Sequence, residues 1–83
     1  MELLERATPL PLAAAHPEII ALALHGRLTR ITRHDGAVLG YVELIDSGEG
    51  EQFRAKRLRP RAQGFLVVGD FWTADDAVDA LRF

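Results

Sequence analysis

The densest group of side chains that could bind a ligand is a basic stretch over residues 54–61. Its cationic members are Arg54, Lys56, Arg57, Arg59 and Arg61. Because alternate side chains of a strand share one face, Arg54 and Lys56 should project from the face opposite Phe53. Guanidinium and ammonium groups on an open sheet face can contact the phosphates and guanine edges of DNA. This stretch therefore predicts a nucleic-acid-binding surface.

The distribution of charge is consistent with such a surface. Residues 27–61 hold eight basic and five acidic side chains, a net charge of +3, whereas the rest of the chain carries −5. Arg30 and Arg33 belong to this basic middle and complete the predicted binding set. The alternative is a solvated outer face on which the cations pair with acidic side chains of neighbouring strands. The candidates for these acidic partners are Glu43, Glu49 and Glu51.

The residue types that carry catalysis are sparse. Ser47, the only serine, lies in a turn sequence, and the three histidines stand nine positions apart. These histidines are His16, His25 and His34. Neither pattern supplies a nucleophile with its base or the i, i+4 pair of a helical metal site. The chain has no cysteine, so a disulfide framework and a thiolate metal site are excluded. We expect no enzymatic activity, no metal site and no cofactor.

Four segments of strand composition, separated by turn sequences, would position the basic residues. The turns lie at residues 34–36 (His-Asp-Gly) and 47–50 (Ser-Gly-Glu-Gly), and Gly36 supplies a positive φ in the first. The second segment is apolar on both faces and is expected at the centre of the sheet. The predicted strands are Gly26–Arg33, Ala37–Asp46, Glu51–Leu58 and Phe65–Val68.

The residues from Thr73 onward are typical of the start of a helix. The Thr73 hydroxyl can accept a hydrogen bond from a free amide of the first turn, and Asp76 occupies the acidic position of a capping box. One face of this helix is small and apolar, which suits packing on a sheet. That face consists of Ala74, Ala77, Val78 and Leu81.

The first part of the chain is ambiguous. Residues 1–16 contain closely spaced prolines and are expected to form an N-terminal arm, either a short helix over Glu2–Ala7 or a flexible segment. Pro17 and Gly26 fit the start and the stop of a helix, and we favour a short helix over Pro17–Leu24. A strand is the alternative, because apolar residues also recur there with a period of two. These residues are Ile20, Leu22, Leu24 and Leu28.

Together these segments predict an α+β fold, in which an antiparallel meander of three or four strands packs against a C-terminal α-helix. A short N-terminal helix or arm precedes it, and residues 17–83 form the single sheet-plus-helix domain. A domain of this size is small enough to be marginally stable alone, which is consistent with a homo-oligomer such as a dimer or with an appended strand. The predicted core consists of Leu28, Val38, Val42, Leu44, Phe53, Ala55, Phe65, Val67, Phe71, Ala77, Val78 and Leu81.

Residues 53–81 resemble the second half of the DNA-binding domain of plant ethylene-response factors, the APETALA type. The shared pattern reads Phe53-x-Ala55, Pro60, Val68-Gly69-x-Phe71 and Thr73-Ala74-Asp75-Asp76-Ala77-x-x-Ala80-Leu81. The arm-type DNA-binding modules of phage integrases are similar. The resemblance implies a three-stranded sheet packed on one helix, with DNA bound by the sheet. Residues 42–46 depart from the family, because two acids replace its arginines. The contacts implied by carry-over are Arg54, Lys56 and Arg59.

Two functions are consistent with the sequence. The first is a small nucleic-acid-binding accessory module, with DNA as the expected ligand. The alternative is a protein–protein interaction or dimerisation module, indicated by the leucine- and proline-rich arm and by the apolar strand Val38–Ile45. No apolar run approaches the roughly 20 residues that span a bilayer, and no secretory signal is evident. We therefore expect a cytoplasmic protein without membrane contact.

Overall fold

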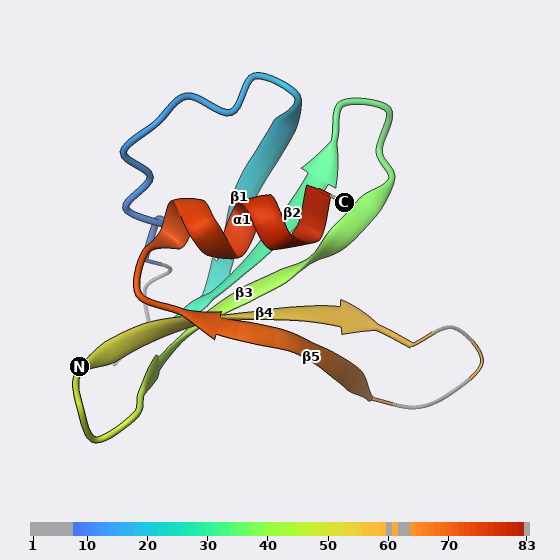
Figure 1. Ribbon diagram of the computed structural model, residues 1–83. Helices are drawn as coiled ribbons and strands as arrows, with labels where there is room; N and C mark the ends of the chain where they lie inside the picture. The colour runs from blue at the N-terminus through green and yellow to red at the C-terminus, as the bar shows by residue number, and fades with distance from the viewer. Residues whose placement is uncertain (1–7, 60, 62–63, 83) are drawn as a thin grey trace, which may run out of the picture.

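The structure, a computed structural model, describes residues 8–59, 61 and 64–82. This part of the chain forms five strands and one helix in two layers (Figure 1). The elements are β1 (Ile19–His25), β2 (Leu28–Arg33), β3 (Val38–Asp46), β4 (Glu51–Leu58), β5 (Phe65–Phe71) and α1 (Ala74–Arg82). The predicted antiparallel meander with a C-terminal helix is confirmed, and the sheet has five strands in place of three or four.

The additional strand is β1, so the predicted helix over Pro17–Leu24 is wrong. Ile20 lies opposite Thr32 of β2, and Leu22 lies opposite Arg30. This pairing satisfies backbone groups that a helix would have satisfied internally, and the period-two alternation matches it. The other expected helix, over residues 2–7, lies outside the described residues.

The five strands lie in chain order, with β3 at the centre as predicted and with β1 and β5 at the edges. The predicted hairpin turn between β2 and β3 is present. Gly36 has a φ of 94°, a conformation that glycine adopts without a steric penalty. The Asp35 carboxylate accepts a hydrogen bond from the Ala37 amide at 2.9 Å, which closes the turn.

α1 lies across one face of the sheet, over β3, β4 and β5 (Figure 1). Its predicted cap is present, because Thr73 Oγ1 accepts a hydrogen bond from the Asp76 amide at 3.1 Å. Gly40 of β3 lies beneath the last turn. A Cβ at Gly40 would lie 2.7 Å from Leu81 Cδ2 and would overlap the carbonyl oxygen of Lys56. The glycine therefore permits the close approach of helix and sheet.

The core lies between α1 and the sheet. All four predicted helix residues are buried, and so are the predicted Val42, Phe53 and Ala55. Leu44 and Phe71 are partly buried and pack against this cluster. The central strands therefore present the faces that the alternation predicts.

β2 presents the opposite face from the one predicted. Thr29 and Ile31 are buried, and Thr29 lies opposite the buried Val42. Leu28 lies opposite Glu43 on the other side of the sheet and is only partly buried. The prediction of Leu28 in the core is therefore wrong. The six residues of β2 have mixed polarity, so their sequence does not show which face is buried. The register with β3 decides it.

A β-bulge in β3 moves Val38 out of the predicted core. Ile31 pairs with Gly40. The next residue, Thr32, pairs with Val38, so Leu39 is an extra residue. The insertion reverses the alternation, and Val38 faces away from α1 with 49% of its surface exposed. Leu39 packs against the core in its place.

A second bulge, in β5, has the same effect on Phe65 and Val67. The register shifts between Ala55 and Lys56, and Lys56 pairs with Val67, which makes Val68 the extra residue. Phe65 and Val67 therefore share the face of Lys56, and both are exposed. Their predicted place in the core is wrong, because alternation holds only where no residue is inserted.

Residues 8–16 run beside α1 on the same side of the sheet (Figure 1). Leu10 and Leu12 of this segment pack against the core. α1 and residues 8–16 thus form one layer over the sheet. We term the side of the sheet beneath them the covered face and the opposite side the uncovered face.

Asp75 joins this segment to the first turn of α1. Its carboxylate accepts hydrogen bonds from the Ala13 amide at 3.1 Å, from the Ala14 amide at 3.2 Å and from His16 Nε2 at 3.0 Å. The hydrogen bond with His16 is the main cause that holds the pKa of Asp75 below its usual range. The two amides add to this effect and burial opposes it. The described part of the predicted arm is therefore attached to the domain.

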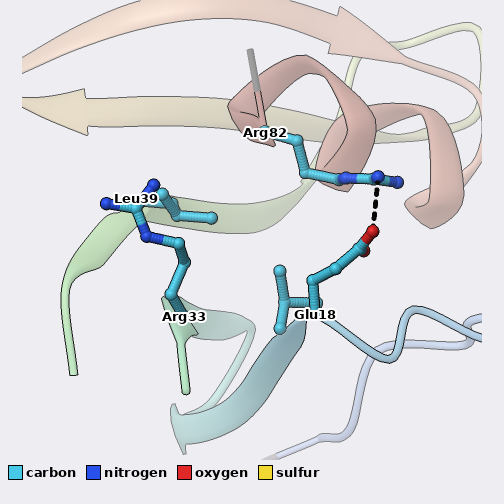
Figure 2. A pocket seen from close by; sticks show the side chains of 5 residues that line it. Glu18, Arg33, Leu39 and Arg82 are labelled. Carbon is cyan, nitrogen blue, oxygen red and sulfur yellow. Dashed lines mark hydrogen bonds and ion pairs between the residues drawn. The ribbon is translucent and has the colours of Figure 1, made fainter. Parts of the chain in front are cut away.

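A further ion pair joins the start of β1 to the end of α1. Arg82 Nη2 lies 3.0 Å from Glu18 Oε2 (Figure 2). These two side chains line a shallow pocket of about 210 Å³ together with Ile19, Arg33 and Leu39. The pair therefore holds the last turn of the helix beside the edge of the sheet.

Candidate interaction surface

The centre of the uncovered face carries a row of charged side chains from β2 to β5. We term it the charged strip, and it consists of Arg30, Glu43, Arg54, Lys56 and Asp70. In β4 the alternation holds as predicted, because Phe53 and Ala55 are buried while Arg54 and Lys56 face the other way. The register of the neighbouring strands brings the remaining three side chains to the same face.

Both β4 cations of the charged strip have carboxylate partners. Arg54 donates hydrogen bonds to both oxygens of Asp70, from Nε at 2.8 Å and from Nη2 at 3.0 Å. These hydrogen bonds are the main cause that raises the pKa of Arg54 and lowers the pKa of Asp70. Lys56 Nζ lies 2.9 Å from Glu43 Oε1, one of the pairs that the sequence predicts as an alternative. These positive charges are therefore compensated within the sheet.

Aromatic rings flank the charged strip. Lys56 Nζ lies 4.6 Å from the centre of the Phe65 ring, which is within the range of a cation–π interaction. Tyr41 meets Phe65 edge-on, with ring centres 5.3 Å apart and planes at 79°. Arg30 lies opposite Tyr41, and its Nε is buried with no hydrogen-bond partner in the described part of the chain. Cations and aromatic rings thus share one face.

Arg57 points to the covered side. Its guanidinium donates hydrogen bonds to the carbonyl oxygens of Leu81 at 3.0 Å, Leu39 at 3.3 Å and Ala80 at 3.5 Å. The carbonyls of Ala80 and Leu81 lie at the C-terminal end of α1, where they lack partners within the helix and where the helix dipole favours a cation. Arg57 therefore caps α1 and is directed away from the charged strip.

The other predicted binding residues are dispersed. Arg33 Nε lies 3.8 Å from Asp35 Oδ1, and Arg33 lines the pocket beside α1 (Figure 2). Arg59 and Arg61 are exposed in the connection between β4 and β5. Of the seven predicted binding residues, the structure therefore brings together only Arg30, Arg54 and Lys56.

Beside the charged strip, the β4–β5 hairpin exposes apolar side chains, among them the Phe65 and Val67 of the predicted core. We term them the apolar edge: Leu58, Phe65, Leu66, Val67 and Val68, with exposed fractions between 39% and 58%. The start of β5 extends beyond α1, so the helix does not cover it (Figure 1). The place of β5 in the chain could have predicted this exposure, because the last strand of a meander has a neighbouring strand on one side only.

β5 also has a free side in the sheet. No strand of the described chain pairs with its outer edge. Edge strands of monomeric proteins are commonly protected by charged residues or proline, and residues 65–69 contain neither. β5 therefore offers unpaired backbone groups together with exposed apolar side chains.

A cleft adjoins the apolar edge at Leu58. The pairing of β3 with β4 runs from Tyr41 and Lys56 to Asp46 and Glu51. On the other side of Tyr41 and Lys56 the two strands separate, so the β2–β3 and β4–β5 hairpins diverge there (Figure 1). The cleft between them has a volume of about 450 Å³. It is lined by Val38, Leu39, Gly40, Tyr41, Arg57 and Leu58.

Comparison of the chain with protein-family models, with curated proteins and with solved structures gives no match. The resemblance to the ethylene-response-factor domain therefore stays a prediction. Within residues 8–59, 61 and 64–82, no three histidine or acidic side chains gather into a metal-binding group. The same residues contain no helix with the length and apolar character needed to cross a membrane.

Proposed function

We propose that this domain is a protein-interaction module that binds its partner along the apolar edge. The observation that carries the proposal is an uncharged apolar strand, Phe65–Val68, exposed at a free edge of the sheet. Partner proteins add a strand to such an edge through backbone hydrogen bonds, and the exposed side chains supply specificity. Clustered exposed apolar side chains are a mark of protein-interaction sites.

Binding of nucleic acid through the uncovered face is the second candidate. It is favoured by the placement of Arg30 and Lys56 beside the rings of Tyr41 and Phe65, because cations contact phosphates and aromatic rings stack on bases. The carboxylates that pair with the β4 cations weaken this candidate, since they repel the phosphate backbone. We therefore rank it below the interaction module.

Selection from a displayed library of random peptides tests the first proposal. We expect the wild-type domain to enrich extended apolar peptides and the Val67→Lys variant to lose this enrichment, because lysine protects an edge strand. Ile20→Lys is the matched control, since Ile20 is 45% exposed on the opposite edge strand. Circular dichroism verifies that both variants fold. A wild type that stays monomeric and enriches no peptide, or enrichment that survives Val67→Lys, contradicts the proposal.

Titration with a mixed-sequence DNA duplex at two salt concentrations tests the second candidate. Binding should fall steeply with salt, and the combined Arg54→Ala and Lys56→Ala substitutions should reduce the slope of log affinity against log salt by about two. Arg27→Ala combined with Arg33→Ala removes the same charge away from the charged strip and serves as the control. Absence of binding at low salt rejects this candidate.

A further inference from the structure

We infer that the partner of the apolar edge is β5 of a second copy of this chain, paired antiparallel about a twofold axis that passes through Leu66. The inference rests on the proposed function and names the partner for the same surface. The sheets of the two copies would join edge to edge into one continuous sheet. Such an interface is self-complementary, because the same residues meet on both sides.

The backbone of β5 is oriented for this pairing. The Arg59 amide donates a hydrogen bond to the Gly64 carbonyl at 3.3 Å, so these two residues form a hydrogen-bonded pair of the hairpin. Successive residues of a strand direct their backbone groups to alternate sides. Leu66 therefore directs its groups toward β4, whereas Phe65 and Val67 direct theirs to the free outer edge.

The regular part of β5 determines the register. The bulge at Val68 ends the regular segment after Val67. A twofold axis perpendicular to the sheet keeps the uncovered faces of both copies on the same side. It therefore pairs residues whose side chains point to the same face. With the axis at Leu66, Phe65 of each copy lies opposite Val67 of the other. Aromatic and β-branched side chains are a favourable cross-strand pair, and the two Leu66 side chains meet on the opposite face.

Charge does not oppose pairing with a second copy. Residues 64–69 carry no charge, so the paired strands bring no like charges together. The nearest acid, Asp70, is held by Arg54 at 2.8 Å. The other edge strand, β1, is a poorer candidate. Its exposed large apolar side chains are only Ile20 and Leu22, and both lie on one face.

The available area fits a weak dimer. The five side chains of the apolar edge expose on the order of 400 Å² in each copy, which is within the range of an interaction patch. Edge-to-edge pairing covers the backbone and only the flanks of these side chains, so the buried area stays below the roughly 1,000 Å² of a specific interface. We therefore expect a reversible dimer that dissociates on dilution.

Single cysteines test the pairing, because the chain contains none of its own. At the twofold axis the two Leu66 residues form a non-hydrogen-bonded pair with Cα atoms about 4.5 Å apart, within the range of a disulfide. Leu66→Cys should form an intermolecular disulfide under mild oxidation, on the order of tenfold faster than Ile20→Cys. The two positions are matched in exposure, at 49% and 45%. Sedimentation of the wild type should show the mass rise from monomer to dimer with concentration.

Substitution at the edge provides a second measurement. Val67→Lys should raise the dissociation constant of the dimer on the order of tenfold or more, because it places a lysine from each copy in the interface. Ile20→Lys should leave that constant unchanged. A wild type that stays monomeric up to its solubility limit overturns the inference. A disulfide that forms equally fast from Ile20→Cys also overturns it.

These outcomes are separable from the failure of the proposed function. A monomeric wild type whose peptide enrichment depends on Val67 would keep the interaction function and reject only the second copy as partner. A monomeric wild type that enriches no peptide would reject both.

Discussion

Arg57 shows that a cation predicted to meet a ligand can instead hold the fold together. Its guanidinium donates hydrogen bonds to the carbonyl oxygens of Leu39, Ala80 and Leu81. We predict that Arg57→Met lowers the free energy of unfolding by about 1–3 kcal/mol, because the partly buried carbonyls lose their donor and α1 loses a favourable charge. Urea denaturation measures this change.

Arg27→Met is the control for this prediction. Arg27 lies 3.8 Å from Glu51, and both side chains are more than half exposed. An exposed pair of this kind contributes about 0–1 kcal/mol, so the control variant should remain close to the wild type. An Arg57 variant as stable as the Arg27 variant would show that α1 does not depend on its cap.

Asp75 predicts a pH dependence of stability. Its folded pKa is depressed, mainly by the hydrogen bond with His16, whereas the unfolded value is about 4. A depressed carboxyl stabilises the fold above the unfolded pKa, and this contribution is lost as the pH falls through the folded pKa. The difference in unfolding free energy between the wild type and Asp75→Asn should therefore be fully present at about pH 5 and shrink below about pH 4.

Chemical denaturation at a series of pH values measures this difference. Asp76→Asn is the control, because it removes a charge from the exposed side of the same helical turn. It measures the loss of charge at the start of the helix dipole without the loss of the hydrogen bonds to residues 8–16. A difference for Asp75→Asn that persists unchanged to pH 2 would count against this role of the carboxylate.

The sequence predicts some of the contacts of the candidate site. Alternation in β4 is enough to place Arg54 and Lys56 opposite Phe53, and cross-strand pairing suggests Glu43 as a partner. The bond between Arg54 and Asp70 needs the register of β5. That register depends on a bulge and on the length of a loop, which composition does not reveal.

At the scale of elements, local signals predict where strands lie better than which side they bury. The predicted bounds of β4 are confirmed, because turn residues limit it on both sides. The helix predicted in place of β1 is wrong, because Pro17 and Gly26 fit a helix as well as they fit the ends of a strand. Only its partner β2, a contact made in the folded chain, decides between the two.

The close approach of α1 to β3 depends on Gly40. We expect Gly40→Ala to lower the free energy of unfolding by about 2 kcal/mol or more, because the new methyl group meets a backbone oxygen of β4 and the side chain of Leu81. Thermal or urea denaturation measures the loss.

Gly69→Ala is the control within the same sheet. A Cβ at Gly69 would lie 3.0 Å from the end of the partly buried Phe71 ring, and no backbone atom lies as close. We expect a loss smaller than that of Gly40→Ala. Equal losses for the two variants would show that strand propensity, and not the close approach of α1 to β3, sets the cost.

At the scale of the whole molecule, the layer order predicts a gradient of protection. Amides of β3 have strands on both sides and α1 above them, whereas no strand of the described residues pairs with the outward amides of β5. Hydrogen exchange should therefore be slowest in β3 and fast at Phe65 and Val67 in dilute protein. It should slow at these two positions as the concentration rises. Exchange at Phe65 and Val67 that is slow at every dilution would contradict the free edge.

The core has a consequence for the order of events during synthesis. α1 supplies four of the nine buried apolar residues of the described core, and it follows all five strands in the chain. On the ribosome, the covered face therefore emerges before the helix that shields it, and Asp75 is made long after the segment that it anchors. We expect the domain to close only when α1 has left the exit tunnel.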